Sequence, residues 1–193
     1  VVDQIGRSNP TFPYIDGGVS ISRTARTYPT YLIFKPSMIF ASFLLILYWV
    51  KTNKLINNLQ QFESKNLFKT FGILSAIFLI IHSIFLGIKF DYDLYKFFRR
   101  FVLLAFIIFE IVAQSLLVFR LFKLKSSIKD YFNNYALVLK IILVSILVVV
   151  AILSLPIVVT SGNIHFKHAL EWNYFVGVIL FYLFSRFFWK RTT

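Results

Sequence analysis

The segment from Ile141 to Leu155 constrains this chain most, because it reads IILVSILVVVAILSL and contains no charged residue. It belongs to an apolar run of more than about 20 residues, the length of helix that crosses the hydrocarbon core of a bilayer. Inside lipid the backbone N–H and C=O groups have no water to bind, so such a run must form a helix. The sequence therefore predicts an all-α, polytopic transmembrane helix bundle.

Four other apolar stretches approach or exceed this length. The five predicted spans are 36–55, 67–88, 97–122, 136–159 and 169–189. The first is short, and it reaches full length only if Lys35 snorkels its ammonium to the surface and Pro36 occupies the first helical turn. We predict two regions, an outer or lumenal polar segment over 1–35 that forms a cap and a single transmembrane domain over 36–193.

Composition excludes several classes of function. Hydrophobic residues make up 58% of the chain, and the formal net charge is +13. A nucleic-acid partner is not expected, because the Lys and Arg residues lie between apolar runs and accompany no recognition motif. The chain has no Cys, which excludes disulfides and thiolate metal sites, and no cofactor is expected.

The distribution of basic residues predicts an orientation. With five spans, 12 Lys and Arg fall on one side and 9 on the other. The positive-inside rule then places the N-terminal segment outside or in a lumen and the C-terminus in the cytoplasm. Because the chain begins at Val1 and five spans leave its N-terminus outside, we expect either a lost signal or helix before Val1 or a processed chain.

Within the spans, three polar residues are candidate functional groups, since ionisable side chains in lipid are costly. Glu110 and Gln114 are four residues apart and share a helix face. His82 lies on the preceding span, within possible hydrogen-bond reach of Glu110. This pair can be a proton relay or head-group site, but an interhelical polar clamp is the favoured interpretation. Helix packing is expected at small residues, namely Gly72, Ser75, Ala76, Ala151 and Ser154.

A second polar group lies where the last span begins, in the sequence NIHFKHALEW. Its members His165, His168 and Glu171 recur every three residues and are weak metal candidates, so no metal is predicted. The favoured interpretation is an interfacial cap. A lipid head-group site is the alternative, in which arginines bind phosphate while His168 and Glu171 act as base or orienter. The outer-face cluster so predicted comprises Arg23, Arg26, Arg99, Arg100, His168 and Glu171.

The polar stretch before the first span reads FPYIDGGVSISRTARTYPTYLIFKP, residues 12 to 36. Pro13 and Gly17-Gly18 indicate a turn. We predict a structured cap in which Asp16 or Glu171 pairs with an arginine, and a disordered arm is the alternative.

Several of these residues resemble a known family. The matches are Pro13-Tyr14-Ile15-Asp16-Gly17-Gly18 with Ser20 and Ser22, Pro29, His82, and Glu171-Trp172 at the last helix. They resemble the six-helix damage-regulated autophagy modulators (DRAM), a family that also includes GPI-anchor lipid-remodelling factors and phosphoinositide regulators. Asp16 stands where the family has Ser, and the first helix is absent. The resemblance implies a membrane-embedded modulator without an agreed catalytic set.

From this we expect a non-enzymatic integral membrane modulator or accessory subunit, in contact with membrane lipids and other membrane protein subunits. A lipid-binding or lipid-remodelling factor of GPI or phosphoinositide type is the alternative. A small transporter using Glu110 and Gln114 is a further one.

Overall fold

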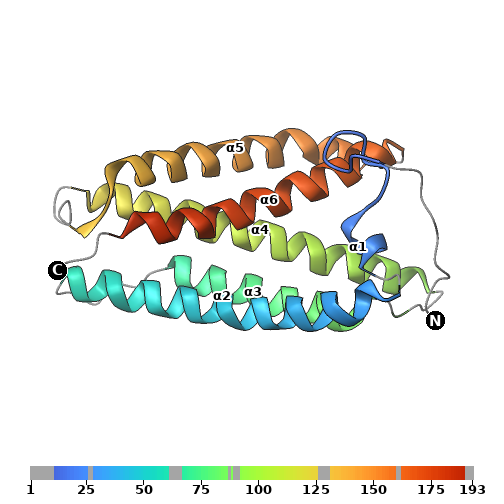
Figure 1. The fold of residues 1–193 in the computed structure, drawn as a ribbon, viewed down its shortest axis with the longest axis horizontal. Helices are drawn as coiled ribbons and strands as arrows, with labels where there is room; N and C mark the ends of the chain where they lie inside the picture. The colour runs from blue at the N-terminus through green and yellow to red at the C-terminus, as the bar shows by residue number, and fades with distance from the viewer. Residues whose placement is uncertain are drawn as a thin grey trace. The chain divides into compact units, whose positions relative to one another are not determined.

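The structure, a computed structural model, describes residues 11–25, 28–60, 67–86, 88, 92–125, 131–159 and 162–189. These residues form six helices, labelled in Figure 1. They are α1 (Ile21–Thr24), α2 (Thr30–Gln60), α3 (Leu67–Phe85), α4 (Asp93–Lys123), α5 (Asn134–Val159) and α6 (Ile164–Phe188). The predicted all-α architecture is confirmed.

Four of these helices, α2 to α5, are long and apolar enough to cross a membrane. The fifth predicted span coincides with α6, whose 25 residues rise about 37 Å and so match a bilayer in length. Its first turns are more polar, because they carry His165, Lys167, His168 and Glu171. The helices fit a multi-pass membrane protein.

Helix α2 differs most from the prediction. It begins at Thr30, within the segment predicted to be a polar cap, so that Pro36 lies inside the helix. A missing N–H is tolerated in a membrane helix when neighbouring groups satisfy the freed carbonyl. The helix also continues to Gln60, beyond the predicted end of the span at residue 55, because Ile56 there is fully buried and keeps the helical period of the core-facing side.

The described chain divides into two compact units. The first contains α1, α2, α3 and the part of α4 up to Ala113. In it, Gly72 of α3 lies so close to the fully buried Trp49 of α2 that a Cβ on the glycine would overlap the indole ring. Gly72, Ser75 and Ala76 are all buried on α3, which confirms them as packing positions.

Of the described residues, the second unit contains 11–20, the part of α4 from Gln114, and helices α5 and α6. Gly177 of α6 lies against the side chain of Leu147 on α5, and the Tyr174 hydroxyl donates to the Leu147 carbonyl at 2.8 Å. Ser154 was predicted to be a contact point between helices, but its hydroxyl donates to the Ala151 carbonyl of its own helix. Here Gly177 provides the close approach between helices.

Candidate functional site

The loop before α1 folds around Asp16. One carboxylate oxygen of Asp16 accepts the Phe12 N–H at 2.7 Å and the other accepts the Gly18 N–H at 3.1 Å. The Ile15 and Asp16 amides in turn donate to the Phe12 carbonyl. Asp16 therefore organises its own turn, and the predicted pairing of Asp16 or Glu171 with an arginine stays a prediction. A short carboxylate satisfies nearby amides at lower entropic cost than it can reach a distant guanidinium.

This loop lies against the first turns of α6, in the same unit. Nδ1 of His168 is 3.0 Å from the Gly17 carbonyl oxygen. Nε1 of Trp172 donates to the Val19 carbonyl, and the Asn173 amide donates to the Tyr14 carbonyl, both at 2.9 Å. These three polar side chains of α6 recur within one and a half turns and hold three carbonyls of the loop. The loop–α6 junction is thus a tight, backbone-directed contact.

Two further features hold the junction. Gly17 has φ of 60°, and a Cβ at this position would overlap the His165 carbonyl, so only glycine fits. The Tyr14 ring meets the Trp172 ring edge-on at 5.4 Å between centroids. Of these residues the sequence indicated Gly17, His168 and Trp172 by motif and Tyr14 as part of it, but nothing in a local pattern singles out Asn173.

The weak metal candidates do not come together as a metal site. Within the described ranges no group of three or more His, Asp or Glu side chains could hold a metal ion. One ring nitrogen of His168 is engaged with the Gly17 carbonyl instead. The trio His165, His168 and Glu171 follows one side of α6 at the loop–α6 junction.

The predicted head-group cluster divides between the two units. Arg23 is exposed on α1, and Arg99 and Arg100 lie on α4, all in the first unit. His168 and Glu171 belong to the second unit, and Arg26 lies outside the described residues. Within the first unit Arg99 and Arg100 are adjacent on α4, and within the second unit His168 and Glu171 lie on the same side of α6.

The buried polar group of the first unit centres on Glu110, which is fully buried. The Ser75 hydroxyl of α3 donates to its carboxyl oxygen at 2.6 Å and lies 2.9 Å from the Gly72 carbonyl oxygen. This is an interhelical clamp, the form that the sequence favoured for Glu110. Gln114, one turn further along α4, is also fully buried, in the part of the helix that belongs to the second unit.

The predicted hydrogen bond between His82 and Glu110 is absent among the described contacts, and the reason is helix register. Ring contacts between α3 and α4 pair Phe85 with Phe98, Phe78 with Phe101 and Phe109, and Phe71 with Phe109. In this antiparallel register Ser75 comes level with Glu110, and His82 comes level with the third turn of α4.

A buried lysine in the second unit escaped the sequence analysis. Lys140 of α5 is only 1% exposed, and its ammonium donates to the Ser185 hydroxyl at 2.7 Å. The same nitrogen lies 4.2 Å from the centroid of the Phe181 ring and 5.4 Å from that of Phe188. We call these four residues the Lys140 cage. Lys140 lies near the start of an apolar run, and nothing in the local sequence distinguishes it from the basic residues of the loops.

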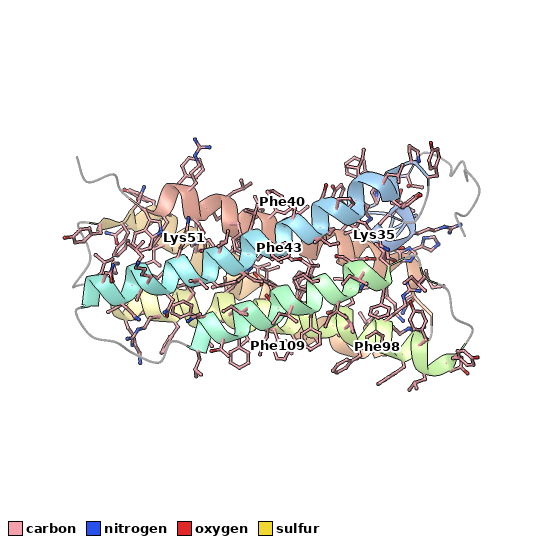
Figure 2. The ribbon with its side chains drawn as sticks, turned by 90° about the horizontal axis from the view of Figure 1, so that it is seen from below. Lys35, Phe40, Phe43, Lys51, Phe98 and Phe109 are labelled. Carbon is pink, nitrogen blue, oxygen red and sulfur yellow. The ribbon has the colours of Figure 1, made fainter. Side chains whose placement is uncertain are left out.

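Helix α2 presents one side to its surroundings. Its exposed positions include the large apolar residues Ile33, Phe40, Phe43, Leu44 and Leu47, which share one side of the helix and are here named the exposed α2 face. The opposite side carries the buried Ser42, Trp49 and Ile56. Figure 2 shows Phe40 and Phe43 along α2 between Lys35 and Lys51.

These sites differ in what they can do. The loop–α6 junction, the Glu110 clamp and the Lys140 cage each join one part of the chain to another, whereas the exposed α2 face presents large apolar side chains outward. The chain matches no protein-family model, and neither the curated proteins nor the solved structures yield a match.

Proposed function

We propose that this chain is a non-enzymatic modulator or accessory subunit of a membrane protein complex, which contacts lipid and a partner helix through the exposed α2 face. The observation that carries the proposal is the composition of that face. Ile33 is 72% exposed, Phe40 64% and Leu47 51%. A continuous exposed apolar stripe of this kind is a contact surface, because apolar side chains form no hydrogen bonds with water and are stabilised by contact with lipid or another protein.

The two lysines that bracket this face support a position within the membrane. Lys35 and Lys51 are 16 residues apart, which corresponds to about 24 Å of helix rise. Long lysine side chains that snorkel in opposite directions extend this distance to the roughly 30 Å of the hydrocarbon core. The exposed α2 face then lies at the depth of the lipid tails.

The burial of α2 supports a partner helix as well as lipid. Only 11% of its span is buried within the chain, against 28 to 44% in the spans of α3, α4 and α5. Membrane helices associate by van der Waals packing, and α2 retains most of its surface for such packing. An accessory subunit needs a helix of this kind.

The buried polar groups support a structural role over a catalytic one. The Glu110 carboxyl accepts the Ser75 hydroxyl, and the Lys140 ammonium binds Ser185. Nδ1 of His168 faces a loop carbonyl. Groups that would be candidates for acid, base or nucleophile thus join elements of the fold to one another.

Lipid binding, the function that the DRAM resemblance implies for part of that family, is the second candidate. It is favoured by one observation, the Arg99 guanidinium 5.9 Å from the ring of Tyr95, which lines an aromatic recess at the start of α4. The membrane orientation and the family assignment stay predictions that accompany both candidates.

The test is gentle purification of the protein from its native membrane, followed by identification and quantification of co-purifying chains and lipids. We expect a partner subunit in a fixed stoichiometric ratio. The variant Phe40→Ala/Phe43→Ala should lose that partner. The matched control Phe119→Ala/Phe122→Ala removes two exposed phenyl rings with the same spacing from α4 and should retain it. A protein that purifies with lipids but without a stoichiometric partner would contradict the subunit proposal, as would equal retention by both variants.

A further inference from the structure

Lys123, the last residue of α4, holds its ammonium over an exposed phenyl ring. Its Nζ lies 4.5 Å from the centroid of the Phe119 ring. Helical side chains lean toward the N-terminus, so Lys123 bends back along α4 and does not extend beyond the helix end. Phe119 is 57% exposed and Lys123 is also exposed. This cation is therefore held at a position that a molecule outside the chain can reach.

An apolar track runs along α4 beneath Lys123. Residues that precede it by 4, 7 and 11 positions lie on the same side of the helix, within about 60° of one another at 100° per residue. They are Phe119, Leu116 and Val112, and together with Lys123 they are here named the Lys123 track. The opposite side of α4 carries the fully or nearly fully buried Gln114, Leu117 and Leu121. The Lys123 track therefore faces the surroundings of the protein.

The length of the Lys123 track matches one leaflet of a bilayer. From Lys123 to Val112 the helix rises about 16 Å. Half of the roughly 30 Å hydrocarbon core is about 15 Å. Because α4 ends at Lys123, the ammonium lies at one end of the span and the apolar residues lie toward its middle. An acyl chain can therefore follow the track while its head group lies at Lys123.

Other basic residues surround the head of the track. Arg120 lies three positions before Lys123 and so neighbours it on the helix surface. Lys125 is exposed in the turn that follows α4, and Arg186 is exposed near the end of α6. Figure 1 shows the ends of α4 and α6 at the same end of the second unit.

The carboxylates of the second unit lie elsewhere. Those that the structure describes are Asp16 and Glu171, and both belong to the loop–α6 junction, where α6 begins. About 37 Å of helix separates that junction from the last residue of α6. Within the second unit, no described carboxylate therefore lies at the basic end to cancel its positive potential.

We propose that the Lys123 track binds an anionic phospholipid, with the phosphate at the Lys123 ammonium and one acyl chain along Phe119, Leu116 and Val112. A lysine ammonium binds phosphate oxygens through charge-assisted hydrogen bonds. The neighbouring Arg120 and Lys125 favour a head group with net negative charge, because the choline of a zwitterionic lipid would meet the same positive field. The inference rests on the lipid contact in the proposed function and assigns to it a lipid class and a position.

The experiment uses the full chain in detergent and native mass spectrometry with added dioleoyl phosphatidic acid or dioleoyl phosphatidylcholine. We expect phosphatidic acid to bind more tightly. Lys123→Gln should weaken its binding about tenfold, the effect of losing one charge-assisted contact, and Lys123→Arg should retain most of it. Lys54→Gln removes an exposed lysine near the end of α2 and is the matched control, which should leave binding unchanged.

A second pair of variants tests the apolar part of the track. Phe119→Ala should weaken both lipids and leave the preference for phosphatidic acid, because the ring contacts the acyl chain and not the head group. Phe166→Ala removes an exposed ring near the start of α6 and should change neither lipid. Gel filtration of each variant checks that it is folded.

Several outcomes would overturn the proposal. They are equal binding of the two lipids, an equal effect of Lys54→Gln and Lys123→Gln, or inorganic phosphate that displaces phosphatidic acid, which would indicate a site for the free anion. If the wild-type protein keeps a stoichiometric partner but binds the two lipids equally, the site is wrong and the proposed function stands. A Lys123-dependent preference for phosphatidic acid in a protein without such a partner would instead support the site and remove the subunit proposal.

Discussion

The Lys140 cage predicts a strong dependence of stability on a single hydroxyl group. Lys140 is 1% exposed, and its ammonium donates to the Ser185 hydroxyl at 2.7 Å. Replacing Ser185 by Ala leaves this donor buried without that acceptor. The attraction to the Phe181 and Phe188 rings remains, since both rings stay in place.

The expected cost follows from these contacts. An unsatisfied buried donor costs about 1 to 3 kcal/mol, and charged donors lie at the upper end. Hydrogen bonds between membrane helices average only about 0.6 kcal/mol with a maximum near 1.7 kcal/mol, because unfolded helices in lipid also find partners. We therefore expect Ser185→Ala to lower the free energy of unfolding by about 1.5 kcal/mol. Lys140→Met should cost under about 1 kcal/mol or stabilise, because it removes the donor and keeps a similar apolar volume.

The assay is equilibrium unfolding in mixed micelles with an increasing fraction of dodecyl sulfate, followed by tryptophan fluorescence. In the Lys140→Met background, Ser185→Ala should cost less than about 0.5 kcal/mol, so that the double-mutant cycle shows a coupling of about 1 kcal/mol. Ser154→Ala is the control, because that buried hydroxyl donates only to the Ala151 carbonyl of its own helix. An equal cost of Ser185→Ala in both backgrounds would refute the reasoning.

Three further predictions use the same unfolding assay or limited proteolysis. Gly72→Ala should destabilise by about 1 to 3 kcal/mol, because the added methyl overlaps the buried Trp49 ring. Ser75→Ala should destabilise by about 1 kcal/mol, because it removes the hydroxyl bound to the buried carboxyl of α4. Gly17→Ala should release the loop from α6 and speed cleavage by proteinase K within residues 12–20, because a Cβ overlaps the His165 carbonyl and φ is positive.

Each of these has its own control. Trp49→Phe should recover part of the stability lost in Gly72→Ala, and no recovery would mean that the indole ring is not the obstacle. Ser83→Ala removes a buried hydroxyl that donates within α3, so a cost as large as that of Ser75→Ala would count against the clamp. Gly18→Ala meets no positive φ and crowds the Thr11 side chain rather than a carbonyl of α6, so cleavage as fast as in Gly17→Ala would show that the loop does not depend on glycine at position 17.

Many residues of the candidate site could be predicted from the sequence, but the residues that they contact could not. Asp16, Gly17 and His168 stood out from turn chemistry and from spacing, and all three take part in the loop–α6 junction. Glu110 stood out because a carboxyl group in an apolar run is costly. Its partner was predicted to be His82 and is Ser75, because ring packing between α3 and α4 sets a register that no local pattern contains.

The amino-acid sequence by itself determined the class of this protein and the positions of its helices. Apolar runs of about 20 residues have one solution in lipid, a helix that satisfies its own backbone, so the four long apolar helices α2 to α5 follow from hydrophobicity alone. Helix ends were less determined, since Thr30 and Gln60 extend α2 through polar sequence that lipid does not constrain.

Tertiary structure decided which polar groups meet. Helices that are apolar on every side have no preferred orientation from hydrophobicity, so their rotation and register depend on steric fit at positions such as Gly72 and Gly177. That fit brings Lys140 under two phenyl rings and places Ser75 level with Glu110. Contacts between residues far apart in the chain depend on how the helices pack in three dimensions, and the hydrophobic pattern alone does not determine this packing.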